Sequence, residues 1–243
     1  FNIQDNSPTV NLISPSNTSF RTSPVNFTYN VTDDFTINNC SLFIFDTAWN
    51  KNKTHTSITK NVAMNFSVTL PEYNYLWFVQ CFDNRDQESN SSTFNITIDN
   101  TKPVITISHP VNGTTIAGTP TTQTWNFTIT ENNPGTCWYN VNDKTNISVA
   151  CTNTSASFTL IKGIWNNITI YANDTAGNSG NNITFFFTNT QPNKIILTDP
   201  ANNTLKVFDN LTFYWQIGVD NDSDGLNYTI HVSDQLDFST LLM

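Results

Sequence analysis

One opening motif occurs three times along the chain, and its spacing limits the possible folds more than any other feature. Each copy starts at a proline and reaches a second proline, and an asparagine stands two positions after this second proline. The second prolines are 95 and 90 residues apart. This spacing suits a seven-stranded sandwich of about 100 residues and is far too long for a solenoid repeat. The three copies are Pro8–Asn17, Pro103–Asn112 and Pro192–Asn202.

The repeat also predicts the domain organisation. Short segments that end in proline, Asn100–Pro103 and Asn189–Pro192, separate consecutive copies and leave little slack. If strands of about ten residues rise about 3.3 Å per residue, each unit extends the chain by ~30–40 Å, so we expect a stiff, beaded rod. The predicted parts are a linker at 1–6, complete units at 7–101 and 102–191, and the N-terminal part of a third unit at 192–243.

Side chains alternate with a period of two inside each unit. In 26–31 the residues Phe27, Tyr29 and Val31 alternate with polar ones, and 125–130 repeats this pattern. Farther on, Trp77, Val79 and Cys81 correspond to Ile168, Ile170 and Ala172. Many short alternating strands between turns rich in Asn, Asp, Gly and Pro predict an all-β class of tandem immunoglobulin-like β-sandwich domains.

Composition excludes two classes of partner. Only 12% of the 243 residues are charged, and the net charge is −9. Binding to nucleic acid or to anionic lipid needs clustered Lys and Arg, so neither partner is expected. No apolar run approaches the ~18 residues that cross a bilayer, and no membrane-spanning segment is expected. Because Phe1 is not a start methionine, we expect the chain to be part of a longer polypeptide.

The motifs resemble the tandem immunoglobulin-like repeats of microbial surface proteins, especially archaeal ones. The resemblance depends on the opening motif and on the turn segment Ala172–Ser179, which is similar to an Ala-x-Asp-x-x-Gly-Asn turn. The first copy departs there, with Arg85 to Glu88 in place of Gly-Asn, so its turn is expected to differ. The third copy, with Phe213–Trp215 before an acidic loop, resembles a fibronectin type III domain. The resemblance implies a fold and leaves function open, because this sandwich hosts many activities.

Four cysteines in an Asn- and Thr-rich chain predict disulfides and an oxidising compartment. Four cysteines allow three pairings, and the repeat boundaries favour Cys40 with Cys81 and Cys137 with Cys151. Cys81 shares the inward phase of its strand with Trp77, so a bridge across the first core is expected. The alternative is four reduced, buried thiols. A metal site is not favoured, because the chain has no Cys-x-x-Cys motif.

The chain contains 19 Asn-x-Ser/Thr sequons, about twice the number expected for its content of these residues. Many have an apolar middle residue, as in Asn95-Ile-Thr, which would place the Asn and Thr on the outer face. We therefore predict a glycoprotein, while bare polar strand faces remain the alternative. The predicted acceptors are Asn17, Asn26, Asn30, Asn39, Asn52, Asn65, Asn90, Asn95, Asn112, Asn126, Asn146, Asn153, Asn167, Asn173, Asn182, Asn202, Asn210, Asn221 and Asn227.

Catalytic residues are not expected. His55, His109 and His231 fall one to a unit and are interpreted as solvated surface residues, because no Ser-His-Asp or Cys-His grouping can be formed from the pattern. The acids of segment 83–88 could serve as a carboxylate pair, but a hairpin turn is the favoured interpretation.

A calcium loop is the one metal site that the pattern permits. Asp220, Asp222 and Asp224 alternate before Gly225, and alternating carboxylates can surround a hard cation. The later bidentate Glu of an EF-hand is missing, and no other cofactor is indicated.

Tryptophans offer a carbohydrate-binding hypothesis. Trp77, Trp125 and Trp215 fall on the apolar phase, which favours core packing. Trp49, beside Asn50 and Lys51, is the one predicted exposed platform.

These features favour an extracellular structural or adhesive glycoprotein segment, a rigid spacer or stalk of a surface protein, and not an enzyme. Its expected partners are N-linked glycans and other surface proteins or copies of itself. One alternative is a subunit of an extracellular filament or surface array that self-associates through its domains. Another is a non-catalytic accessory region of a large secreted hydrolase.

Overall fold

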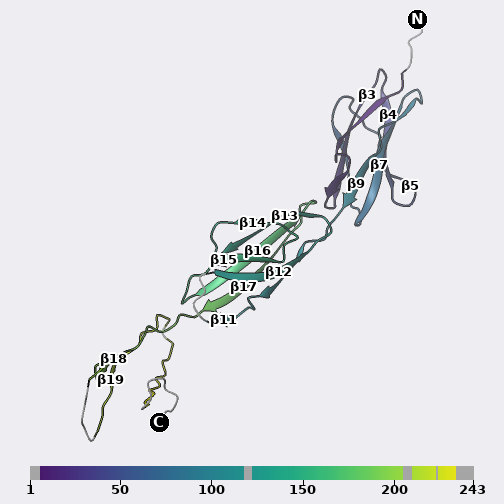
Figure 1. Cartoon of the computed structure of the whole chain (residues 1–243). Helices are drawn as coiled ribbons and strands as arrows, with labels where there is room; N and C mark the ends of the chain where they lie inside the picture. Colours follow the sequence, from purple (N-terminus) through teal and green to yellow (C-terminus); the bar gives the residue numbers. More distant parts are fainter. Residues whose placement is uncertain (1–5, 118–121, 205–209, 223, 234–243) are drawn as a thin grey trace.

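The computed structural model describes residues 6–117, 122–204, 210–222 and 224–233, and all regular elements in these ranges are β-strands. Two sandwich units and the beginning of a third follow one another along a line (Figure 1). The predicted linker lies almost entirely outside the described residues, as do 205–209, 223 and 234–243 of the third unit. None of the described residues forms a helix of the length and apolar character that a bilayer requires.

The first unit consists of two sheets. The smaller sheet has the order β1 (Thr9–Ser14), β3 (Val25–Thr32), β6 (Met64–Val68). The larger sheet has the order β2 (Ser19–Arg21), β9 (Phe94–Ile98), β7 (Tyr73–Asp83), β4 (Ile37–Phe45), β5 (Trp49–His55), and β8 (Glu88–Asn90) pairs with β7.

The second unit repeats this topology. Its smaller sheet is β10 (Val104–His109), β12 (Thr122–Thr130), β15 (Ser155–Thr159). Its larger sheet is β11 (Thr114–Ile116), β17 (Ser179–Thr188), β16 (Trp165–Asp174), β13 (Pro134–Val141), β14 (Ile147–Val149).

Each complete unit encloses its own core between the two sheets. The first core contains Phe27, Tyr29 and Val31, and the second contains Trp125 and Phe127, as the alternation predicts. The six matched residues of β7 and β16 are also buried in these cores: Trp77, Val79 and Cys81, and Ile168, Ile170 and Ala172.

The opening motif is a turn that fastens the start of each complete unit to its last strand. Asn17 Oδ1 accepts from the Asn95 N–H on β9 (2.7 Å), and Asn112 Oδ1 accepts from the Phe185 N–H on β17 (2.9 Å). The motif asparagine therefore satisfies a main-chain donor on the neighbouring strand. The next residue has positive φ in all three copies: Thr18, Gly113 and Asn203.

The third unit begins like the other two and leaves its apolar face open. β18 (Ile196–Asp199) pairs with β19 (Tyr214–Gln216), and Leu197 lies opposite Trp215. The corresponding pairs are Leu12 with Tyr29 and Ile107 with Phe127, with a register shift at the same place in all three units. Trp215 is nevertheless 41% exposed, so the prediction that it packs in a core is wrong for the described part of this unit.

The expected inward phase of the apolar sequon residue fails in several places: Ile147 and Tyr228 are exposed, and so is Ile183 on β17. In the sequon Asn182-Ile-Thr the apolar residue was expected inside, but Ile183 is 39% exposed and Thr184 is buried. Thr184 Oγ1 donates to the Pro110 carbonyl (3.0 Å), which satisfies the buried hydroxyl. The run Phe185–Phe187 contains no alternation, so only packing against the opposite sheet fixes which phase faces inward.

Candidate functional site

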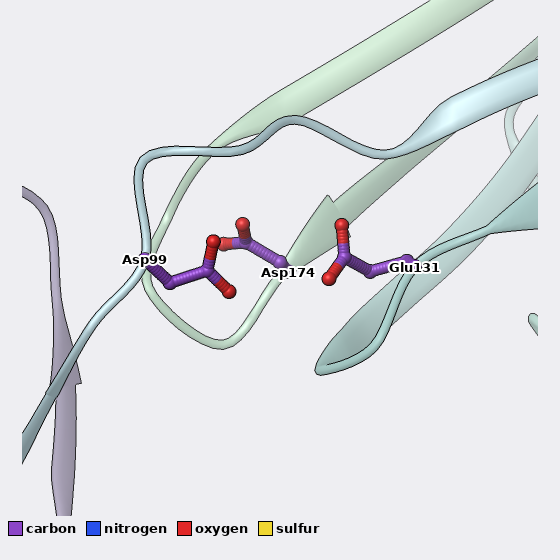
Figure 2. Close-up of side chains that lie close together, drawn as sticks. All are labelled: Asp99, Glu131 and Asp174. Carbon is purple, nitrogen blue, oxygen red and sulfur yellow. The ribbon is translucent and has the colours of Figure 1, made fainter. Parts of the chain in front are cut away.

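Three carboxylates meet where the first unit ends and the second begins (Figure 2). Asp99 directly follows β9, Glu131 directly follows β12, and Asp174 is the last residue of β16. In a tandem sandwich the end of one unit's last strand lies next to the loops at the start of the next unit. The connection along the chain therefore brings these separate residues together.

One carboxylate oxygen from each residue lies within 4.8 Å of the other two. Asp99 and Asp174 are only 7% and 4% exposed, and Glu131 is half-buried. Among the described residues this is the one group of three or more acidic, His or Cys side chains close enough to hold a metal ion. All donors are hard oxygen atoms, the kind that Ca²⁺ and Mg²⁺ prefer.

Local turns hold two of these side chains in place. Asp174 Oδ1 accepts from the N–H groups of Gly177 (2.7 Å) and Asn178 (2.8 Å), and its Oδ2 accepts from Asn178 Nδ2 (2.7 Å). Glu131 Oε1 accepts from the Asn133 N–H (2.9 Å). These turns fix the carboxylates before any ligand arrives.

Hydrogen bonds between the units fix the third carboxylate. Asn133 Nδ2 donates to Asp99 Oδ2 (3.1 Å), and Asn178 Nδ2 donates to the Asp99 main-chain carbonyl (2.9 Å). On the side of the first unit, Glu72 Oε1 accepts from the Asn100 N–H (2.8 Å) and from Thr101 Oγ1 (2.8 Å). The junction is therefore bonded to both units.

Close backbone approach requires glycine next to this junction. A Cβ atom on Gly180 would lie 2.2 Å from the Pro103 carbonyl oxygen, which no real side chain tolerates. Glycine lets β17 lie against the junction that leads into the second unit.

A cavity of about 270 Å³ adjoins two of the three carboxylates, Asp99 and Glu131, and opens between the units. Its wall includes Asp99, Glu131, Asn133 and Glu72. Lys102 also lines it, but no ion pair joins this lysine to the three acids among the described residues.

The sequence pattern did not reveal this cluster, and the acidic loop at 220–225 was the one metal site that it permitted. Within the described residues, Asp220, Asp222 and Asp224 do not form a group of three that could hold a metal. Instead, Asp220 Oδ1 accepts from Thr190 Oγ1 (2.9 Å) and Asp222 Oδ2 accepts from the Thr190 N–H (2.7 Å). Hydrogen bonds, first from the Asp220 carboxyl and then from Thr190, lower the pKa of Asp222. The loop therefore binds the preceding junction segment.

The segment 83–88 forms a hairpin turn, the interpretation that the sequence favoured over a carboxylate pair. Asp83 closes a hairpin between β7 and β8, since its Oδ1 accepts from the N–H groups of Arg85 and Gln87 (both 2.8 Å). Asp174 shares the hydrogen bond from the N–H four residues on, that of Asn178, and Asp86 has positive φ where Gly177 does. The second donor differs: it is the N–H of Arg85, two residues on, at Asp83, and that of Gly177, three residues on, at Asp174. The first unit's turn therefore keeps the backbone conformation of the second unit's turn and differs from it, as expected, in sequence and in one hydrogen bond.

The histidines are spread along the chain, and one of them is not a solvated surface residue. His55 is half-buried, with its Nδ1 3.0 Å from the Tyr29 hydroxyl and its ring 4.0 Å from that of Phe66. Burial, together with the nearby Lys53 charge, lowers the pKa of His55. His109 and His231 are exposed, as expected, and His109 bonds to Gln123.

The two disulfides join the pairs that the repeat boundaries favour, Cys40 with Cys81 and Cys137 with Cys151. The first differs from expectation in position. Cys40 and Cys81 lie directly opposite each other on β4 and β7, so the bridge links neighbouring strands of one sheet and does not cross the core.

None of the sequon asparagines is buried. Thirteen are exposed, and six are half-buried: Asn30, Asn39, Asn95, Asn167, Asn173 and Asn182. Some side-chain nitrogens already have partners, and Asn182 Nδ2 donates to the Ile105 carbonyl (2.9 Å). Ser223, which completes the Asn221 sequon, lies outside the described residues.

Trp49 is 43% exposed and belongs to an aromatic group on the outer face of the larger sheet. Its ring centroid lies 4.8 Å from that of Phe78 and 5.3 Å from that of Phe45. The platform predicted from Trp49 alone is thus wider than expected, because outward-facing phenylalanines extend it.

Comparison with known proteins adds little to these observations. No family model matches the chain, and no curated protein matches it in sequence. The fibronectin(III)-like modules of CbhA from Clostridium thermocellum are similar at 11% identity, with a TM-score of 0.46, over 74% of this chain and 94% of theirs. Part of a 1.5-MDa bacterial ice-binding adhesin is similar at 12% identity, with a TM-score of 0.38, over 80% of this chain and 70% of the matched chain. A chimeric titin Z1Z2 tandem is similar at 14% identity, with a TM-score of 0.31, over 75% of this chain and 100% of the titin chain. Similarity at this level does not extend to function.

Proposed function

We propose that this chain is a non-catalytic, extracellular spacer or stalk that separates other parts of a surface or secreted protein. The observation that carries the proposal is the in-line arrangement of two disulfide-bonded sandwiches joined by residues 99–103, which are hydrogen-bonded to both units (Figure 1). Disulfides persist in oxidising compartments, which supports an extracellular location.

We propose further that the spacer is N-glycosylated. Acceptor asparagines must be accessible to solvent, and the exposure of most sequon asparagines supports sugar at many of them. With 12% charged residues, the chain has few other means of keeping its β-strand edges from pairing with other chains.

Mass spectrometry of the native protein tests the glycan proposal. We expect high occupancy at the exposed Asn26 and Asn126, and lower occupancy at Asn182, whose side-chain nitrogen is already bonded to the main chain. Unmodified Asn95, Asn126 and Asn167 would refute the glycan proposal while leaving the spacer proposal intact.

Electron microscopy of the native protein tests the spacer proposal. We expect beaded rods whose length grows with the number of units. Compact particles, or hydrolytic activity that maps to residues 7–191, would overturn it.

Self-association is a second candidate function, because the third unit exposes an apolar hollow. A cavity of about 340 Å³ is lined by Ile195, Leu197, Trp215, Tyr228 and Ile230. Large apolar surfaces of this kind mark interaction sites. In sedimentation velocity we expect W215S to weaken association and W49S, an equally exposed tryptophan of the first unit, to leave it unchanged. A chain that is monomeric at all concentrations would exclude this function.

A further inference from the structure

The junction carboxylates pose an electrostatic problem that the protein groups do not solve. Asp99 and Asp174 are more than nine-tenths buried, and each has a carboxylate oxygen within 4.8 Å of a Glu131 oxygen. Burying like charges is costly unless a counter-charge is present. Among the described residues, no Lys, Arg or His forms an ion pair with any of the three acids.

A second observation is independent of this clustering. Glu131 Oε2 is completely buried and has no hydrogen-bond partner within the described part of the chain. The other oxygen of the same carboxylate is satisfied by the Asn133 N–H, so the side chain is held with one oxygen left over. A buried acceptor without a partner destabilises the folded protein, and such groups call for an explanation.

The first unit repeats the unsatisfied oxygen at equivalent positions. Asp33 follows β3 as Glu131 follows β12, and Asp83 ends β7 as Asp174 ends β16. Asp83 is fully buried, and both Asp33 Oδ1 and Asp83 Oδ2 are buried without a partner among the described residues. Unsatisfied carboxylate oxygens thus recur at the N-terminal end of each complete unit, where a preceding unit would lie.

We propose that Asp99, Glu131 and Asp174 bind one Ca²⁺ that fastens the first unit to the second. The ion would lie among one oxygen from each acid, with Glu131 Oε2 as the ligand that no protein group satisfies. Ligands about 2.3–2.6 Å from Ca²⁺ can span the observed separation, and the adjoining cavity has room for the waters that complete six to eight ligands. Because Asp99 comes from one unit and the other acids from the next, binding would stiffen the junction.

Calorimetric titration of the whole chain with CaCl₂, after treatment with a chelator, tests the site. We expect a dissociation constant of about 10⁻⁴–10⁻³ M, the range of extracellular modules. E131Q keeps the side-chain shape and the acceptor for the Asn133 N–H but removes the charge, so we expect binding at least tenfold weaker. E72Q is the matched control, because Glu72 lines the same cavity without belonging to the cluster.

Thermal unfolding provides a second measurement. CaCl₂ should raise the unfolding temperature of the unmodified chain and of E72Q, and should not change that of E131Q. If E131Q does not fold, D99N supplies the same comparison, since it removes the acid of the first unit. Three results would overturn the proposal: no Ca²⁺ binding by the unmodified chain, equal affinity in E131Q, or an unfolding temperature of E131Q that exceeds that of the unmodified chain by the same amount with Ca²⁺ as without it. The last would mean that repulsion between the acids is relieved by a proton.

Discussion

The two complete units have the same strand order but fill their cores differently. The buried tryptophan of the first unit is Trp77 on β7, which packs edge-on against Phe27 of the opposite sheet at 4.9 Å between ring centroids. The buried tryptophan of the second unit is Trp125 on β12, at the position equivalent to Phe27. Ile168 on β16 is at the position equivalent to Trp77. The large residue has moved from one sheet to the other.

A neighbouring position also differs between the two units. Phe66 lies opposite Phe27 in the first unit, whereas the small Ala156 lies opposite Trp125 in the second. Trp125 and Ile168 together are close in volume to Phe27 and Trp77, and cores tolerate an exchange that keeps volume better than one that changes it. Ala156 in place of Phe66 is not offset at these positions, so this part of the second core is the smaller one. The comparison teaches that this fold specifies which positions are buried, but not which sheet supplies the bulk.

Removing either tryptophan should have the largest effect. We expect W77A and W125A each to destabilise their own unit by about 3–5 kcal/mol, through lost burial and the cavity left behind. Differential scanning calorimetry of the whole chain should show the transition of the altered unit move to lower temperature while the other stays. We expect the first unit to melt last, because its core contains 18 buried residues against 11.

A double variant sharpens this test. I168W alone should overpack the second core and cost about 1–3 kcal/mol, whereas W125F with I168W recreates the first unit's arrangement and should lose less than about 1.5 kcal/mol. If the double variant is as unstable as I168W alone, the exchange between sheets is not what balances the two cores.

Much of this core could be predicted from the sequence, because alternation alone identifies the buried phase where apolar and polar residues strictly alternate. Tyr29 and Phe127 are examples. The method failed on β17, where three consecutive phenylalanines remove the alternation and the middle one, Phe186, is the buried member. It also failed at Trp215, since burial there depends on a second sheet and not on the phase of the strand.

The junction site lay beyond sequence reasoning for a different reason. Asp99, Glu131 and Asp174 are up to 75 residues apart and belong to two units, so their meeting depends on how one unit follows the next. One signal was available: Asp83 and Asp174 end matching strands in the two copies. Because the two units share one strand order, matched acids at equivalent strand ends predict a shared structural role in the turn that follows, although not a shared ligand.

The disulfides should give the next largest difference between the units. Closing a loop across 41 residues is expected to stabilise the first unit by about 4 kcal/mol, and closing one across 14 residues the second by about 3 kcal/mol. The C40A/C81A variant should lose further stability beyond this loop-closure contribution, because both of its cysteines are fully buried in the core. The C137A/C151A variant should lose less in this way, because Cys151 is half-buried. Denaturant unfolding of each double variant measures the two losses, and a larger loss for C137A/C151A would contradict this ranking.

A relocated bridge provides the control. Ala172 lies opposite Cys137 as Cys81 lies opposite Cys40. We therefore expect C151A/A172C to form a new bridge between β13 and β16 and to recover most of the stability that C151A loses. Free thiols in this variant would show that the second unit does not accept the first unit's geometry.

The smallest expected effect concerns the turns that carry Asp83 and Asp174. Both share the main-chain hydrogen bond from the Asp N–H to the carbonyl four residues on, but the left-handed position is Asp86 (φ 62°) in the first unit and Gly177 (φ 99°) in the second. A residue other than glycine there costs about 1–2 kcal/mol, partly offset because glycine loses more entropy on folding. We expect D86G to stabilise the first unit by a few tenths to about 1 kcal/mol, and G177A to destabilise the second by about 1 kcal/mol. Chemical denaturation can resolve both changes, and opposite signs in the two units are the decisive result. If both substitutions destabilise, the Asp86 side chain contributes contacts that outweigh its backbone conformation, and the two turns are equivalent in shape but not in energy.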